Sequence, residues 1–339
     1  MNSTLSADIE HFVTNCPFRK ELQGKHVLIT GGTGLIGSTL IHCLSALNAN
    51  IHITVPVRNK AKLEALSGTL YNSFNCIVCN LETYDFNQIK DVDYIFHCAA
   101  PTASSFFISH PVETAKSIID ITDKLLQYAK NHPISGMVYL SSLEVYGGGL
   151  DDKVITEDMQ GYWDIQDVRS SYPIAKRAAE NLCHLYAEEY EVPVKIARLT
   201  QTTGIGISKN DNRIINQFAR LAASGQDIIL HSTGESARPY CYTIDCISAL
   251  FYILFKGNNG EAYNVANKET FISARDLAEY IKKHFAPQIK VIIDIKDNMG
   301  YAPASKLYLS TEKIENLGWK AHYDLYDIID QLIKSFKQP

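Results

Sequence analysis

The sequence has no surplus of positive charge and no long hydrophobic run. Its 339 residues include 32 lysines and arginines against 37 aspartates and glutamates, giving a formal net charge of −5. Proteins that bind nucleic acids or anionic membranes usually carry a basic excess, so this balance argues against both partners. No segment approaches the roughly 18 apolar residues that span a bilayer, and the first residues do not form a signal peptide. We therefore expect a cytoplasmic protein that acts on small molecules.

The sequence also lacks a dense cysteine framework. Its eight cysteines are scattered through segments that read as strands and helices. Such a distribution favours small, reduced core residues over disulfides. Cys76 and Cys79 form a C-x-x-C pair, but no second pair follows at zinc-binding spacing. We expect no metal site.

What the sequence does contain is an alternation of short apolar strands with amphipathic helical segments. Strands are predicted at 25–30, 51–57, 75–79, 93–100, 136–142 and 194–200. Their nearly continuous hydrophobicity is typical of parallel strands that are buried on both faces. The pattern predicts an α/β fold, a doubly wound parallel sheet of the Rossmann type with a second, smaller α/β domain.

We divide the chain into three parts. Residues 1–23 are an N-terminal extension with a helix, residues 24–200 a dinucleotide-binding domain, and residues 201–339 a substrate domain. Segments near 240–270 are candidates to rejoin the larger domain. The loop 147–161 carries turn formers and acidic residues, which makes it a candidate lid or substrate loop.

A glycine-rich turn follows the first predicted strand. Glycines at 32, 34 and 37 fit the pattern G-x-G-x-x-G, and glycines at 31, 34 and 37 recur at three-residue intervals. Without a Cβ, the backbone can turn tightly and bring a pyrophosphate against the amides of a helix N-terminus. The strand before the turn and the helix after it supply the required context. The residues assigned to the dinucleotide are Gly31, Gly32, Thr33, Gly34, Leu35, Ile36 and Gly37.

The end of the second strand discriminates between the two nicotinamide dinucleotides. NAD-binding sites often have an acidic residue there to accept hydrogen bonds from the adenosine ribose. This sequence has Arg58 instead, with Lys60 and Lys62 close behind. A guanidinium suits the additional 2′-phosphate of NADP. NADP is favoured, while NAD stays open, because a basic turn in solvent would look the same.

Tyr172 and Lys176 are four residues apart, in a stretch that reads as helical. On a helix their side chains would lie on one face, and Pro173 is tolerated in a first turn. The Lys176 ammonium is expected to favour the Tyr172 phenolate and lower its pKa by roughly one to three units. Tyr172 would then serve as a general base that takes the proton of an alcohol.

The glycine turn, the segment YLSSLEVYG at 139–147 and the Tyr-x-x-x-Lys pair occur in a characteristic order. Through them, residues 24 to about 335 resemble the extended short-chain dehydrogenase/reductase family, specifically its nucleotide-sugar epimerases, dehydratases and decarboxylases. The resemblance implies that Ser142 binds the reacting hydroxyl, Tyr172 is the base, and Lys176 holds the nicotinamide ribose. Glu144 would move a proton beside a transient ketone, unless it is a strand-end carboxylate in solvent or in a structural ion pair.

The resemblance also implies further contacts. Arg238 would grip the diphosphate of the nucleotide, and Arg213 would approach the nucleotide or lie on a helix surface. The cofactor would also contact Asn80, Leu81, Ala99, Ala100, Tyr172 and Lys176, and the substrate would contact Pro101, Ser142, Gln201, Arg213 and Arg238.

The sequence departs from the pattern of this family at four places, all at the substrate end of the site. Leu143 replaces the acid that protonates a departing hydroxyl in dTDP-glucose-type dehydratases, which makes that reaction less favoured. Gln201 and Ile205 replace a usual asparagine and proline, and Ile118 replaces a supporting asparagine. The segment 299–319 lacks the usual arginine ahead of its helix.

The sequence thus predicts an enzyme that uses NAD(P) to oxidise C4 of a nucleotide sugar to a 4-keto sugar. Decarboxylation, as in UDP-glucuronate decarboxylases, or epimerisation is the leading outcome, with dehydration behind them. The alternative enzyme is an NADPH-dependent reductase of a sugar or polyol carbonyl. A non-catalytic NADP(H) sensor is a further alternative. By analogy with the family, a homodimer would pair the helix that bears Tyr172.

Overall fold

The computed structural model describes residues 3–151, 153–208, 211–295 and 305–337. Its larger part is a seven-stranded parallel sheet in the order β11-β7-β5-β4-β1-β2-β3. The strands are β1 (His26–Thr30), β2 (His52–Val57), β3 (Asn75–Val78), β4 (Tyr94–His97), β5 (Gly136–Ser142), β7 (Val194–Leu199) and β11 (Ala262–Val265). The strand order reverses between β1 and β4, and this is where doubly wound sheets bind ligands.

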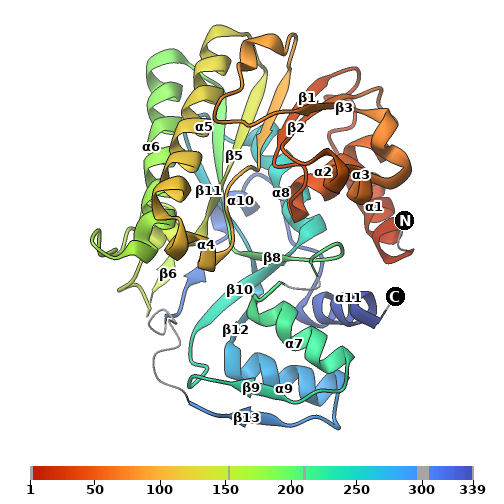
Figure 1. Ribbon diagram of the computed structural model, residues 1–339, viewed down its shortest axis with the longest axis vertical. Helices are drawn as coiled ribbons and strands as arrows, with labels where there is room; N and C mark the ends of the chain where they lie inside the picture. The colour runs from red at the N-terminus through yellow and green to blue at the C-terminus, as the bar shows by residue number, and fades with distance from the viewer. Residues whose placement is uncertain (1–2, 152, 209–210, 296–304, 338–339) are drawn as a thin grey trace.

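Helices cover both faces of this sheet (Figure 1). One face carries α5 (Pro111–Asn131) and α6 (Ser171–Tyr190), and the other carries α2 (Leu35–Ala46) and α8 (Thr243–Lys256). The helices α3 (Lys60–Ser67) and α1 (Ser3–Asn15) lie beside α2. The fold class predicted from the sequence, a doubly wound parallel α/β sheet, is confirmed.

A smaller part of the molecule lies below the carboxyl ends of the large sheet in Figure 1. One of its sheets orders β12-β10-β8, and another pairs β9 with β13. Its strands are β8 (Gln201–Thr203), β9 (Ile228–Leu230), β10 (Ala237–Tyr242), β12 (Asn267–Ser273) and β13 (Val291–Ile293). Its helices are α7 (Ile214–Ala223), α9 (Ala274–Phe285) and α11 (Leu325–Lys337). Between these elements the chain returns to the large sheet with α8 and β11.

The N-terminal extension is part of the core. Phe12 of α1 packs on Phe251 of α8, with ring centroids 5.5 Å apart, and both rings are buried. Asp8 accepts hydrogen bonds from the hydroxyls of Tyr242, at 2.6 Å, and Tyr323, at 3.3 Å. The extension therefore connects α8, the end of β10 and the segment that precedes α11.

The loop 147–161, a candidate lid, is held in place by both its ends. Gly148 and Tyr162 form a two-residue antiparallel bridge, and β6 (Val154–Ile155) pairs with β14 (Tyr308–Leu309), which is followed by α10 (Glu312–Glu315). Leu150 is buried in a small cluster with Leu307. None of the described residues of this loop lines the large cavity presented below.

Among the described residues, no helix is long and apolar enough to cross a membrane.

Candidate active site

The glycine turn between β1 and α2 is shaped by close backbone approaches. Gly31 has a φ of +72°, and a Cβ there would lie 2.7 Å from the carbonyl carbon of Cys98. A Cβ on Gly37 would lie 2.4 Å from the Gly31 oxygen. The N-cap residue of α2, Gly34, has no capping side chain, so the first amides of the helix stay free to bind an anion. This backbone fits a dinucleotide pyrophosphate.

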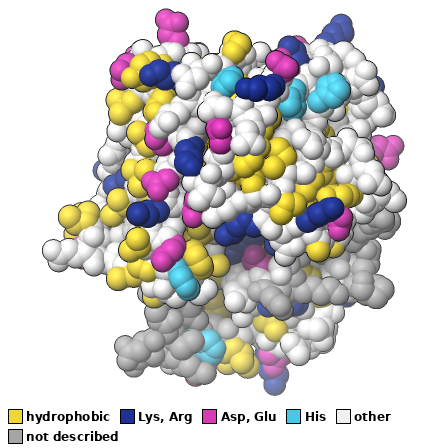
Figure 2. Space-filling model, turned by 45° about the horizontal axis from the view of Figure 1, so that its top comes forward, with side chains coloured by type: hydrophobic (Ala, Val, Ile, Leu, Met, Phe, Trp, Pro, Cys, Tyr) yellow, Lys and Arg dark blue, Asp and Glu magenta, His cyan; other side chains and the backbone are white. Residues whose placement is uncertain are grey.

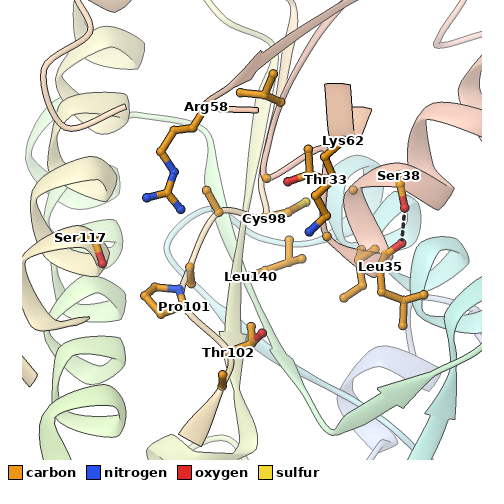
Figure 3. A pocket seen from close by; sticks show the side chains of 18 of the residues that line it. Thr33, Leu35, Ser38, Arg58, Lys62, Cys98, Pro101, Thr102, Ser117 and Leu140 are labelled. Atoms are coloured by element: carbon orange, nitrogen blue, oxygen red, sulfur yellow. Dashed lines mark hydrogen bonds between the residues drawn. The ribbon is translucent and has the colours of Figure 1, made fainter. Parts of the chain in front are cut away.

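A cavity of about 1060 Å³ opens at this turn, at the carboxyl ends of the strands around the β1/β4 switch point. Figure 3 shows part of its wall, where Leu140, Cys98, Pro101 and Thr102 lie opposite Thr33 and Leu35. The smaller part of the molecule contributes the segment 206–208 and Arg213. Predicted cofactor and substrate residues that line this cavity are Gly31, Thr33, Gly34, Leu35, Ile36, Gly37, Arg58, Asn80, Leu81, Ala99, Ala100, Pro101 and Arg213.

Two basic side chains extend into the cavity from the end of β2 and from α3. These are Arg58 and Lys62, which Figure 3 shows on either side of Cys98. On the face shown in Figure 2, basic and acidic side chains are interspersed, and basic side chains border the hollow near its middle. A concave site with positive charge at one end suits a ligand that carries phosphates.

Tyr172, Ser142 and Lys176 lie together behind the cavity wall rather than in it. Tyr172 is on the first turn of α6 and Ser142 ends β5, and the Ser142 hydroxyl lowers the pKa of Tyr172. Lys176 is buried and donates to the Leu140 carbonyl at 2.6 Å. Leu140 itself lines the cavity, so only this residue separates the Lys176 ammonium from the predicted cofactor site. The Tyr172 ring stacks on Phe107 of α4 (Ser104–Ser109), with centroids 4.3 Å apart.

The expected effect of Lys176 on Tyr172 is wrong for this arrangement. Burial raises the pKa of Tyr172 well above its ordinary value, and the nearby Glu144 carboxylate raises it further. The groups that lower this pKa are the Ser142 hydroxyl and the Arg169 guanidinium. Burial also lowers the pKa of Lys176 to about 8. Both groups are buried, and the loss of hydration disfavours the charged form of the phenol and of the amine.

Glu144 is in an ion pair. Nη2 of Arg169 donates to both carboxylate oxygens of Glu144, at 3.1 and 2.9 Å. Nη1 of Arg169 is shielded from solvent and has no hydrogen-bond partner among the described residues. The Arg169 guanidinium also lies 5.1 Å from the centroid of the Phe107 ring. Glu144 and Arg169 are therefore immediate neighbours of the group around Tyr172.

The turn that carries Glu144 is fixed by its own hydrogen bonds. Arg177, which follows Lys176 on α6, donates to the carbonyls of Val145, Tyr146 and Gly161, at 2.5, 3.1 and 2.8 Å. The indole Nε1 of Trp163 donates to the Glu144 carbonyl at 2.8 Å. The helix α6 thus holds Tyr172 and Lys176 and anchors the backbone that directly follows Glu144.

The remaining predicted residues lie elsewhere. Gly32 is not on the cavity wall, because it packs against β2, where a Cβ would lie 2.3 Å from Val55 Cγ1. The Gln201 side-chain oxygen is buried without a partner among the described residues, beside Thr202, which lines the cavity. Arg238 is on β10 and donates to Ser305 at 3.4 Å. Residues 299–304 of the segment that lacks the usual arginine lie outside the described residues.

The fold, the glycine turn and the cavity define a dinucleotide-binding α/β protein. Residues 27–266 match the NAD dependent epimerase/dehydratase family, and the chain belongs to this family. This confirms the resemblance seen in the sequence.

The similar proteins agree with this assignment. UDP-glucuronic acid decarboxylase 5 of Arabidopsis thaliana is 28% identical over 320 residues, covering 92% of this chain and 89% of that protein. The dTDP-D-glucose 4,6-dehydratase of Dictyostelium discoideum is 29% identical over 273 residues, covering 75% and 61%. The crystal structure of UDP-glucose 4-epimerase from Thermotoga maritima aligns with a TM-score of 0.80 at 19% identity, covering 92% and 99%.

Sequence reasoning did not single out Arg169, Phe107 or Arg177. Arg177 follows Lys176 directly, and Arg169 precedes Tyr172 by three residues, about one helical turn. An arginine at helical spacing from a candidate base is a usable signal. Phe107 gives no such signal, because only the packing of α4 brings it to Tyr172.

Proposed function

We propose that this protein oxidises C4 of a nucleotide-linked sugar with a bound nicotinamide dinucleotide and that decarboxylation or epimerisation follows. The observation that carries the proposal is the cluster of Ser142, Tyr172 and Lys176, with Glu144 beside it, behind the wall of the dinucleotide cavity. The similarity to a UDP-glucuronic acid decarboxylase over 92% of the chain supports it. A UDP-sugar is the first substrate class to test.

Each residue has a proposed role in this reaction. The dinucleotide supplies the hydride acceptor, and the open glycine turn fits its pyrophosphate. Ser142 and Tyr172 hold the C4 hydroxyl, and Tyr172 takes its proton. Since burial raises the pKa of Tyr172, this transfer depends on Ser142 and Arg169, the groups that lower it. Glu144 moves the proton at C5, next to the ketone. Gln201, Arg213 and Arg238 stay proposed substrate residues.

We propose NADP as the preferred cofactor. Arg58 and Lys62 both line the cavity at the end of β2 and the start of α3. The replacement Arg58→Ala is expected to weaken NADPH binding by about tenfold and to change NADH binding little, because a charge-assisted hydrogen bond to a phosphate contributes about 1.5–3 kcal/mol. Fluorescence titration with both cofactors measures this. An equal loss for both would contradict NADP preference.

We also propose a cytoplasmic homodimer. Leu185 and Tyr190 are exposed apolar side chains on α6, the helix that the resemblance assigns to the interface, and Val112 is exposed on the neighbouring α5. Light scattering of the purified protein measures the mass, and a monomer at micromolar concentration would contradict the dimer.

The two basic residues in the cavity, Arg58 and Lys62, also support an NADPH-dependent reductase as the second candidate function.

One experiment separates these functions. Purified protein is incubated with UDP-, dTDP-, GDP- and CDP-sugars, and the products are separated by chromatography and identified by mass. Loss of carbon dioxide, loss of water, isomerisation and reduction differ in mass or retention, and only a net reductase consumes NADPH stoichiometrically. Tyr172→Phe is expected to lower turnover at least 100-fold while NADPH still binds. Full activity in this variant would exclude the proposed chemistry.

A further inference from the structure

Arg169 has a binding capacity that its protein contacts do not use. A guanidinium offers five N–H donors, and here Nη2 alone serves both oxygens of Glu144. Nη1 is shielded from water and has no partner among the described residues. A sheltered donor without a partner is unfavourable, so a ligand that brings an acceptor to Nη1 would gain binding free energy.

The position of Arg169 indicates which part of a substrate would supply the acceptor for Nη1. Arg169 and Glu144 both act electrostatically on the Tyr172 hydroxyl, and the Arg169 guanidinium and the Tyr172 ring both lie against Phe107. In the proposed function, the sugar C4 hydroxyl meets Ser142 and Tyr172. The substituent on C5 then lies on the side where Glu144 is proposed to act, and Arg169 is bonded to Glu144.

Charge decides the chemical class of this substituent. An anionic group at C5 would lie near the Glu144 carboxylate, and two like charges at close range repel. A guanidinium between them can donate to both carboxylates at once, because its planar N–H groups point in different directions. Arg169 is the guanidinium at this position, since it is already paired with Glu144.

We propose that Arg169 is a specificity-determining residue that binds the C5 carboxylate of a nucleotide-linked hexuronate through its free Nη1 edge, while Nη2 stays paired with Glu144. This inference rests on the proposed function and narrows its substrate class to nucleotide hexuronates. The same contact holds the carboxylate next to the carbon that becomes activated when C4 is a ketone. A neutral hexose has no group that would use this donor.

Calorimetric titration with UDP-glucuronate and UDP-glucose, in the presence of NADPH, tests the inference. Arg169→Gln is expected to weaken UDP-glucuronate binding at least tenfold and UDP-glucose binding less than twofold. Arg169→Lys, which keeps the charge, is expected to fall between Arg169→Gln and the wild type for UDP-glucuronate. Arg19→Gln, a change at an exposed arginine that contacts the Asn48 carbonyl, is the control and should alter neither affinity.

The outcomes separate two kinds of failure. Equal losses for both sugars, or no loss for either, in a variant that still binds NADPH would overturn the role of Arg169 and leave the proposed function standing. A wild-type protein that binds NADPH but neither binds nor converts any nucleotide sugar would overturn the proposed function and this inference with it. An Arg169→Gln variant that no longer binds NADPH would show a structural role and also overturn the inference.

Discussion

At the scale of single residues, the dinucleotide site depends on glycines, which have no Cβ atom. Gly37 brings the first turn of α2 so close to the Gly31 carbonyl that a Cβ would lie 2.4 Å from the oxygen. The contact is with backbone, so a rotamer change cannot relieve it. The approach between the glycine turn and α2 is therefore only compatible with glycine at this position.

Gly37→Ala is expected to weaken NADPH binding by at least tenfold, because the turn must open to admit the methyl group. Overpacking of this kind also costs about 1–3 kcal/mol of folding free energy. Fluorescence titration and thermal unfolding measure the two effects. Gly148→Ala is a matched control, since its Cβ would meet nothing closer than the Tyr162 oxygen at 3.9 Å. NADPH binding unchanged by Gly37→Ala would contradict this account of the turn.

At the scale of elements, α1 is attached to the rest of the chain through a buried carboxyl group. Asp8 binds the hydroxyls of Tyr242 and Tyr323, and burial raises its pKa to about 6. Tyr242 ends β10, and the cavity-lining segment 206–208 follows β8, the parallel neighbour of β10. The docking of α1 thus supports one wall of the proposed cofactor site, and the raised pKa of Asp8 predicts that this docking depends on pH.

The sign of the pH effect follows from the direction of the shift. The pKa of Asp8 is higher in the folded chain than the ordinary value of 3.8, so folding favours the protonated form. This contribution is complete below pH 4 and is lost as the pH rises through about 6. It amounts to about 2–3 kcal/mol, since one pKa unit corresponds to about 1.4 kcal/mol.

Asp8→Asn should remove this dependence, because the amide keeps the shape and carries no charge. We expect the variant to be more stable than the wild type at pH 7.5 by about 2 kcal/mol, and the difference to shrink toward pH 4.5. Urea unfolding at a series of pH values measures it. A stability difference that stays constant between these pH values would show that Asp8 does not titrate in this range.

At the scale of the whole molecule, the cavity joins the two parts of the chain. Its wall combines the glycine turn and the ends of β2 and β4 with the segment 206–208 and Arg213 of the smaller part. A ligand that contacts both parts stabilises the folded molecule as a unit. The free energy gained at a hundredfold excess over Kd is about 2.7 kcal/mol.

NADPH at about 100 times its Kd is therefore expected to raise the Tm by about 4 °C, since unfolding entropy is about 2.1 cal/mol/K per residue. Differential scanning fluorimetry measures the shift. In Arg58→Ala, the same shift should require about tenfold more NADPH. A cofactor that leaves the Tm unchanged in the wild type would contradict its binding to this cavity.

Much of the fold and the site could be predicted because local sequence controls them. Continuous apolar strands specify a sheet buried on both faces, and glycines at fixed spacing specify the turn before α2. The four-residue spacing of Tyr172 and Lys176 on α6 follows from helix geometry. The domain boundaries and the roles of the individual site residues stay predictions.

Only the tertiary structure decided the surroundings of these groups. The sequence could not show that Phe107 covers Tyr172, that Glu144 pairs with Arg169, or that burial and the Glu144 carboxylate raise the pKa of Tyr172. It also gave no sign that Arg238 lies off the cavity wall. The reason is physical: strand, turn and helix patterns depend on neighbours along the chain, whereas burial and the electric field at a side chain depend on groups that folding brings together.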